Sequence, residues 1–390
     1  MIISMIISLN IIIIAAVLLV LALATPLFSP FFRKVEEEEV SGDDNADGGS
    51  VPPVSIVLTD HDSSFHLKQV LPQLLAQDYP GDYQVIVVID RSDSESEDVL
   101  KLHASDPHLY YTMLPDTSRY LSRKKLGITL GIRAARYDWV LVTDVHSIPS
   151  SEHWLENMAR HCSDNVNMVL GMSLYGDDCP SYFRYDQVRT MLYNLRMAQQ
   201  ATPFSSNQSV VMLRKSEFFA ASGFRGNLEY TRAEFEFLVN KFGKEGACAL
   251  AIEPEAWMKA IKPSSKRWRM RQLFALDAMS GMRRTASYRW LRRVDLGFMH
   301  LYNLLTLAAI IYAAVMLPEL NGIVLMAASL LFWVVSNVER AFIYRPMLRY
   351  FDCVSPFAAV MQDLTLGYRN IIMRLRYAFA DRNDFITHKL

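Results

Sequence analysis

The chain has 390 residues, of which 51% are hydrophobic and 21% charged, and its formal net charge is −1 at pH 7. This length allows one large domain with additional membrane segments, and the nearly balanced charge creates no overall field for a polyanion, so we expect no nucleic-acid partner. The cysteines, at positions 162, 179, 248 and 353, lack the paired spacing of a zinc site or a disulfide framework.

Residues 1–30 are predicted to form a transmembrane anchor, because Ile6–Phe28 is almost wholly apolar and long enough to cross a bilayer. A secretory signal peptide is the alternative, but no Lys or Arg precedes the run, which is also too long for a signal-peptide core. We therefore expect an uncleaved anchor with Arg33 and Lys34 at the inner surface. Residues 31–53 follow as a disordered linker, since their Glu-, Gly- and Asp-rich composition cannot form a core.

Residues 54–275 are predicted to fold as an α/β domain, because short apolar runs alternate with segments of helical periodicity. The predicted strands are Val54–Thr59, Tyr83–Asp90, Leu109–Leu114, Val140–Thr143, Val166–Leu174, Gln208–Arg214 and Ala247–Ile252. The predicted helices are Leu67–Gln77, a short helix after Ser92–Glu97, Lys124–Arg136, Trp154–His161, Tyr182–Gln200 and Phe235–Phe242. This order of elements predicts a Rossmann-like, doubly wound sheet.

An acid and an imidazole, Asp144 and His146, stand at the end of the fourth predicted strand. The carboxyl end of a strand in an α/β fold is a common place for a ligand or a metal. Because side chains alternate along extended chain, both groups should point to one side while Val145 packs the other way. From these residues alone, a ligand site and an ordinary polar turn both remain open.

Two more apolar spans are predicted in residues 296–338, as Leu296–Leu317 and Leu320–Val338. The connection between them carries no Lys or Arg, whereas both outer flanks are rich in Arg. By the positive-inside rule, the connection lies outside, and the folded domain and the C-terminus lie in the cytoplasm. The protein would then be an integral protein of the inner, cytoplasmic membrane.

The segments on either side of these spans are basic. Residues 276–295 are predicted to be a basic juxtamembrane segment that continues the Arg-rich run begun at Lys266–Arg271. Residues 339–390 form a C-terminal helical segment, in which Phe357–Phe379 combines apolar residues with several Arg. That helix is predicted either to lie in the membrane interface, where it would contact membrane lipids, or to pack as a cytosolic helix.

Five segments of the domain occur in the order found in a known family. They are Val54–Thr59, Leu74–Pro80, Val85–Asp90, Lys124–Ala135 and Trp139–Pro149. In this respect the chain resembles the membrane-associated family 2 glycosyltransferases, which are inverting enzymes of the GT-A fold, over roughly residues 51–271. The resemblance implies a Rossmann-like mixed sheet flanked by helices, with one N-terminal and two C-terminal transmembrane helices.

The resemblance also implies which residues bind the sugar donor. Asp90 stands where the family has an acid that contacts the nucleoside. Lys124 or Lys125 lies in the segment that passes beside the nucleotide, where a cation would suit the phosphates; a solvated lysine at a helix start is the alternative. In the first loop this chain has Ser63 in place of the usual Glu, which leaves Asp62 as a candidate substitute in nucleotide contact.

Family members carry Asp-x-Asp after the central strand, and here the pair is Asp144 and His146. The first acid faces the donor ribose, and the second binds the divalent metal that bridges the diphosphate. Mn²⁺ accepts imidazole nitrogen more readily than Mg²⁺ does, so the substitution predicts a divalent metal site that favours Mn²⁺ over Mg²⁺. Such a cation would stabilise the charge on the leaving nucleoside diphosphate.

The family's general base is an acid at the start of a helix in the second half of the domain. The resemblance places Glu234 at that position, with Glu236 as the second candidate and Ala233 where an acidic partner would stand. The base would remove the acceptor hydroxyl's proton for attack at the anomeric carbon. The alternative is an ordinary acidic first turn, favoured by the helix dipole.

Processive family members carry Gln-x-x-Arg-Trp, of which Arg267 and Trp268 are present while Ser264 replaces the Gln. Arg267 would then neutralise diphosphate and Trp268 would stack on a sugar face. A basic patch that contacts anionic lipid is the alternative.

Together these residues predict a glycosyltransferase that moves a sugar from a nucleotide-diphosphate donor to a lipid-linked or glycan acceptor hydroxyl, with inversion, at the cytoplasmic face of the membrane. The alternative is a degenerate member that binds nucleotide sugar or a partner without catalysis, because four motif positions are altered. A transporter is disfavoured, since the predicted spans lack charges within the membrane. Three spans are few for a polymer channel, so we expect addition of a single sugar.

Overall fold

The computed structural model of the chain describes residues 7–32, 51–59, 63–115, 122–206, 209–283 and 285–381. The chain forms two compact units, one of Met1–Lys34 with Ala286–Ile372 and one of Val35–Thr285 with Met373–Leu390. Asp62, Arg33, Lys34 and most of the predicted linker lie outside the described residues.

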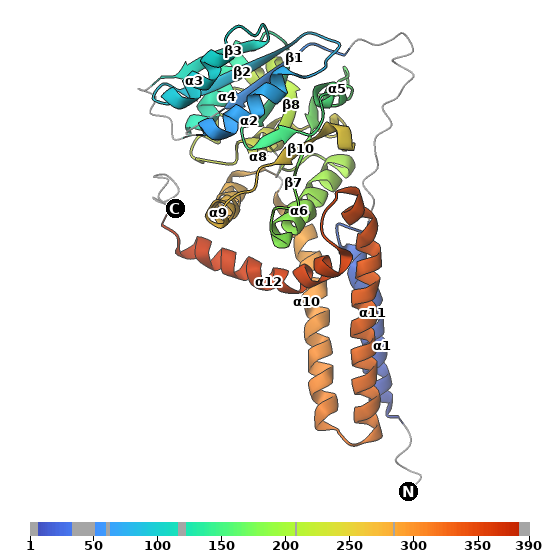
Figure 1. Cartoon of the computed structure of the whole chain (residues 1–390). Coiled ribbons are helices and arrows are strands. Elements are labelled where there is room, and N and C mark those ends of the chain that lie inside the picture. The colour runs from blue at the N-terminus through green and yellow to red at the C-terminus, as the bar shows by residue number, and fades with distance from the viewer. Residues whose placement is uncertain are drawn as a thin grey trace. The chain divides into compact units, whose positions relative to one another are not determined.

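The second unit contains a seven-stranded sheet in the order β3-β2-β1-β4-β8-β6-β9 and a three-stranded sheet in the order β5-β10-β7 (Figure 1). The strands of the large sheet are β1 (Val54–Thr59), β2 (Tyr83–Asp90), β3 (Leu109–Leu114), β4 (Trp139–Asp144), β6 (Met168–Leu170), β8 (Val210–Arg214) and β9 (Cys248–Leu250). Those of the small sheet are β5 (Ser147–Pro149), β7 (Met172–Tyr175) and β10 (Trp257–Ala260). The first four strands in chain order are parallel, and β8 runs antiparallel to β4, so the large sheet is mixed.

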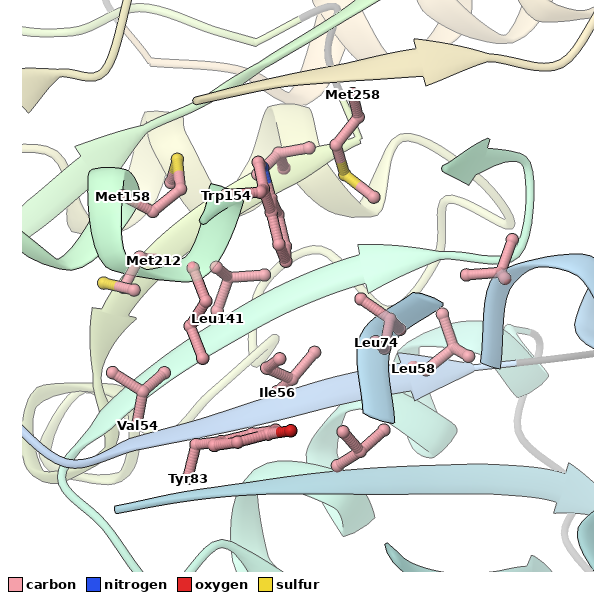
Figure 2. Packing of buried hydrophobic residues seen from close by; sticks show 14 of the residues in the cluster. Val54, Ile56, Leu58, Leu74, Tyr83, Leu141, Trp154, Met158, Met212 and Met258 are labelled. Carbon is pink, nitrogen blue, oxygen red and sulfur yellow. The ribbon is translucent and has the colours of Figure 1, made fainter. Parts of the chain in front are cut away.

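The helices of this unit are α2 (Ser64–Leu75), α3 (Ser94–Leu102), α4 (Arg123–Ala134), α5 (Trp154–Ala159), α6 (Ser181–Gln200), α7 (Lys215–Ala220), α8 (Glu234–Phe242) and α9 (Ser265–Gly281), with a short 3-10 helix at Pro254–Ala256. Strand alternation decides which helices each face of the sheet receives. Ile56 and Leu58 of β1 point into a core shared with α2, α3 and α5, part of which Figure 2 shows. Val57, between them, faces α4.

Close packing of α4 on the sheet depends on two glycines. A Cβ at Gly131 would collide with Val57, and one at Gly127 would lie 3.2 Å from Thr59 Cγ2. Because neither glycine carries a side chain, the helix approaches β1 and β2 closely. This close contact sets the distance between the first turn of α4 and the carboxyl end of β1.

The elements predicted in residues 54–275 are present, but α3 begins inside the expected turn Ser92–Glu97, and β5, β10, α7 and α9 were not predicted. One predicted strand also differs. The run Val166–Leu174 was expected to be one strand, but it divides into β6 and β7, which belong to different sheets. Gly171 lies at the division, where any side chain would meet Val210 and Met158. The chain therefore crosses from one sheet to the other at a position too crowded for a Cβ.

The first unit contains α1 (Leu9–Ala24), continued by a 3-10 helix at Thr25–Phe28, together with α10 (Thr285–Val315) and α11 (Leu320–Tyr350). Among the described residues, Leu9–Phe28, Ala286–Val315 and Leu320–Tyr350 are helical segments long and apolar enough to cross a membrane. Figure 1 shows α1 alongside α11. Much of the predicted basic segment 276–295 is helical, since α9 ends at Gly281 and α10 begins at Thr285.

A buried polar group connects α11 to the start of α12 (Pro356–Phe379). Tyr344 donates its hydroxyl hydrogen to Asp363 Oδ2 at 2.6 Å, and Arg340 NH1 lies 3.9 Å from the same oxygen. All three side chains are buried, so the carboxylate is neutralised where the chain turns from α11 into α12.

Candidate active site

The carboxyl ends of four parallel strands border one cavity of about 480 Å³ in the strand-rich unit. Thr59, Asp90, Leu114 and Asp144 end β1, β2, β3 and β4, and all four line it. The strand register explains this arrangement, because Thr59 pairs with Asp144 and Asp90 with Leu114. This edge of an open α/β sheet is where ligands usually bind.

Asp144 is buried and accepts two contacts that fix its carboxylate. Its Oδ1 accepts the backbone N–H of His146 at 3.0 Å, and its Oδ2 lies 3.3 Å from Lys124 Nζ. Burial by itself would raise the pKa of Asp144, but the charge of Lys124 and the contacts with His146 lower it to about 2. The group is therefore an ionised carboxylate at neutral pH.

His146 lines the cavity with Asp144, but so does Val145. Residues 145 and 146 form a turn after β4, so the expected alternation of extended chain does not hold there. Its backbone oxygen accepts the N–H of Ile261 at 2.7 Å, which ties the loop after β4 to the chain after β10. Burial lowers the pKa of His146 to about 4, so its ring is neutral near pH 7. Nδ1 is buried and has no hydrogen-bond partner among the described residues. The ring of His66, from α2, lies edge-on to the His146 ring, with ring centroids 4.8 Å apart.

An ionised carboxylate beside a neutral imidazole with an unpaired nitrogen is a donor pair that fits Mn²⁺. No group of three or more His, Cys, Asp and Glu side chains suited to a metal occurs in the described parts of the chain. Asp144 and His146 would thus supply only part of a coordination shell.

Asp90 is almost completely buried, and its charge is compensated by Arg123. Nε of Arg123 donates to Asp90 Oδ1 at 2.7 Å, and NH2 contacts the same oxygen. Arg123 also lines the cavity. Nothing in the sequence distinguishes Arg123 beyond its position before two lysines, because the partner of an arginine at a helix start depends on the fold.

The two lysines that follow have different places. Lys124 lines the cavity, and its Nζ lies over the Phe235 ring at 5.2 Å from the centroid. Lys125 is not brought to the cavity. It is buried and donates to the backbone oxygens of Asn227, at 2.7 Å, and Tyr230, while its Nζ lies 4.7 Å from the centroid of Phe237. Burial lowers the pKa of Lys125 to about 8.

Glu234 and Glu236 both reach the cavity from the first turn of α8. Ala233, just before them, has φ of 69°, a left-handed conformation that directs the chain into the helix. Glu234 is buried, and Ser122 Oγ lies 3.5 Å from its Oε1. Burial raises the pKa of the half-buried Glu236 to about 7, although Arg271 acts against this shift.

Helix α9 contributes Arg267, Trp268 and Arg271 to the cavity lining. Ser264, which stands in place of the family's Gln, accepts the N–H of Arg267 at 3.2 Å and caps the helix. One face of Trp268 is stacked on Phe183, with ring centroids 4.6 Å apart, and is closed to a sugar. The Tyr182 ring also packs on Trp268 in a T-shaped arrangement, with centroids 5.4 Å apart. Arg271 was missed by the sequence analysis because it lies beyond the motif that drew attention to this segment.

Comparisons with known proteins agree with this architecture. Residues 55–219 match the model of glycosyl transferase family 2. The mannosyltransferase PcManGT from Pyrobaculum calidifontis, solved in complex with GDP-Man and Mn²⁺, is 16% identical with a TM-score of 0.52, over 91% of this chain and 98% of that chain. This likeness confirms the predicted GT-A fold.

Weaker likenesses also appear. TarS from S. aureus is 15% identical with a TM-score of 0.44, over 63% of this chain and 43% of that one. Residues 1–349 of TarS, solved with UDP-GlcNAc, are 13% identical with a TM-score of 0.42, over 82% and 92% of the two chains. No curated protein matches the chain.

The raised pKa of Glu236 predicts a pH-dependent stability. Because the folded-state pKa of about 7 exceeds the ordinary 4.5, this group stabilises the fold only where it is protonated, and that contribution is lost as pH rises through 7. Glu236→Gln cannot ionise, so it should raise Tm relative to the native protein at pH 8 and leave it nearly unchanged at pH 4. Scanning calorimetry of both proteins, with the exposed Glu255→Gln as control, tests this. An equal Tm difference at both pH values would contradict it.

Proposed function

Because residues 55–219 match the model of glycosyl transferase family 2, we propose that this chain transfers a sugar from a nucleotide-sugar donor to an acceptor hydroxyl, with inversion at the anomeric carbon. The observation that supports this most strongly is the cavity at the carboxyl ends of β1 to β4. It brings two strand-end carboxylates, a neutral imidazole, two helix-start acids and several cations to one place.

The donor would lie along the ends of the parallel strands. Asp90, fixed by Arg123, would contact the nucleoside, and Asp144 would face the ribose. Lys124 would act on the phosphates, since its ammonium group already lies beside Asp144. Asp62 remains a candidate for nucleotide contact from the first loop.

We propose Mn²⁺ as the divalent metal, held by Asp144 and His146. The unpaired Nδ1 of His146 supports this choice, because a neutral imidazole nitrogen suits Mn²⁺ better than Mg²⁺. When bound, the metal would supply positive charge to the departing diphosphate. The mannosyltransferase with the same fold was solved with Mn²⁺.

His146→Ala should weaken Mn²⁺ binding about tenfold or more in the presence of a nucleoside diphosphate, because one of two protein ligands is lost. Electron paramagnetic resonance of free Mn²⁺ measures this without any turnover, and the exposed His153→Ala is the matched control. Equal Mn²⁺ affinity in the His146→Ala and native proteins would exclude the metal role.

We propose that Glu236 is the general base, with Glu234 as the alternative. A base works best when its pKa lies near the working pH, and that of Glu236 is about 7. The base would take the proton of the acceptor hydroxyl as the hydroxyl oxygen forms its bond to the anomeric carbon. The bond from that carbon to the diphosphate breaks on the opposite side, and the nucleoside diphosphate leaves with the electron pair.

Glu236→Gln should lower kcat by about 10²- to 10⁴-fold at unchanged donor affinity, whereas Glu234→Gln should affect kcat less. Single-turnover transfer with a radiolabelled donor, combined with calorimetric donor binding, separates the two effects. The reverse order of the two variants would assign the base to Glu234.

A noncatalytic binding protein is the second candidate. Its support is that Ser264, at the family's Gln position, serves as a helix cap rather than as a cavity ligand. Purified protein with Mn²⁺ and a panel of nucleotide sugars distinguishes the candidates. Slow hydrolysis of one donor supports the transferase, and nucleotide binding without any hydrolysis supports the binder.

We propose that the acceptor is a lipid-linked or glycan hydroxyl at the cytoplasmic face of the membrane. The helices that can span a membrane and the Arg-rich flanks of α10 and α11 support this placement. The start of α12 exposes Phe357, Met361, Tyr368 and Ile371, which favours the interfacial alternative for this helix. A spin label at position 361 should then report lipid rather than water.

Cysteine labelling in intact cells tests the orientation. With the native cysteines replaced by Ser, Glu319→Cys should react with a membrane-impermeant maleimide in intact cells. Arg269→Cys should react only after permeabilisation. Labelling of Arg269→Cys in intact cells would place the strand-rich domain outside.

A further inference from the structure

Arg271 enters the cavity from α9, one helical turn after Arg267. Its NH1 group lies 3.3 Å from the hydroxyl oxygen of Tyr175, to which it donates. Tyr175 ends β7 and also lines the cavity. A strand-end hydroxyl therefore orients a guanidinium group that reaches the cavity from a different element.

The charge of Arg271 acts on two of the carboxylates that the transfer reaction would use. It contributes to the low pKa of Asp144 and opposes the rise in the pKa of Glu236. Lys124, on α4, acts on the same two groups. Arg271 and Lys124, from separate helices, line the same cavity as Asp144 and Glu236.

Resting on the proposed transferase function, we infer that Arg271 is a catalytic residue that binds the diphosphate of the donor. Arg271 lines the same cavity as Lys124 and Asp144, beside which the proposed donor's diphosphate would lie. A guanidinium presents a planar fork of donors that matches phosphate oxygens, and Tyr175 fixes its direction before the donor arrives.

The position of Arg271 also predicts when it acts. Negative charge on the diphosphate increases as the bond to the sugar breaks, so a fixed cation stabilises the transition state more than the bound donor. Loss of the charge should consequently lower kcat more than it raises the donor KM. A residue that only held α9 against β7 would show no such difference once the protein is folded.

The test compares Arg271→Gln, Arg271→Lys and Arg269→Met. Gln keeps a hydrogen-bond donor for Tyr175 but removes the charge, and Lys keeps the charge without the fork. Arg269 is an exposed residue of the same helix, outside the cavity lining, and serves as the control. Titration calorimetry with a nucleoside diphosphate and Mn²⁺ gives affinity, and donor turnover gives kcat and KM.

Arg271→Gln should bind the nucleoside diphosphate about tenfold or more weakly and lose still more in kcat, because a hydrogen bond to a charged group is removed. Arg271→Lys should recover part of both, and Arg269→Met should match the native protein. Native binding and kcat in Arg271→Gln would overturn the inference. Failure of the native protein to bind any nucleoside diphosphate would instead overturn the proposed function.

Discussion

Two buried carboxylates at the ends of parallel strands each need a cation, and consecutive residues of one helix provide both. Asp90 ends β2 and Asp144 ends β4, on either side of β1, and they are paired with Arg123 and Lys124. Successive side chains on a helix point about 100° apart. Arg123 and Lys124 can therefore reach β2 and β4, which lie on opposite sides of β1, from a helix that packs on β1. This works only because the glycine face of α4 lets the helix lie close to β1. The packing of α4 on β1 thus determines which cations neutralise Asp90 and Asp144 in the cavity.

Lys125, which follows Arg123 and Lys124 at the start of α4, contacts the second half of the domain. Lys125 is buried and holds the backbone oxygens of Asn227 and Tyr230, which precede α8 by a few residues. A buried ammonium group must be fully hydrogen-bonded, so this loop is strongly determined. The first turn of α4 consequently positions both the strand-end carboxylates and the chain that leads to Glu234 and Glu236.

Periodicity in the sequence was sufficient to predict β1 to β4, β8 and β9 and their order along the chain, but not β5 or β10. It could not predict the division of Val166–Leu174, because Val210 and Met158 crowd Gly171 only in the folded chain. It could not separate Lys124 from Lys125 either, since neighbouring lysines look alike until the fold buries one of them. Arg123 and Arg271 were missed for the same reason: an arginine acquires its partner only when distant strand ends are brought beside it.

The neutral imidazole of His146 beside Asp144 agrees with the balance of charge in the cavity. Among the described residues, the cavity is lined by four carboxylates, Asp90, Asp144, Glu234 and Glu236, and by five cations, Arg123, Lys124, Arg232, Arg267 and Arg271. A further acid beside Asp144 would need another cation or a bound metal to offset its burial. The neutral ring of His146 avoids that requirement and leaves its Nδ1 without a hydrogen-bond partner among the described residues. With five cations in its lining, the cavity would offset the negative charge of the diphosphate in the proposed donor.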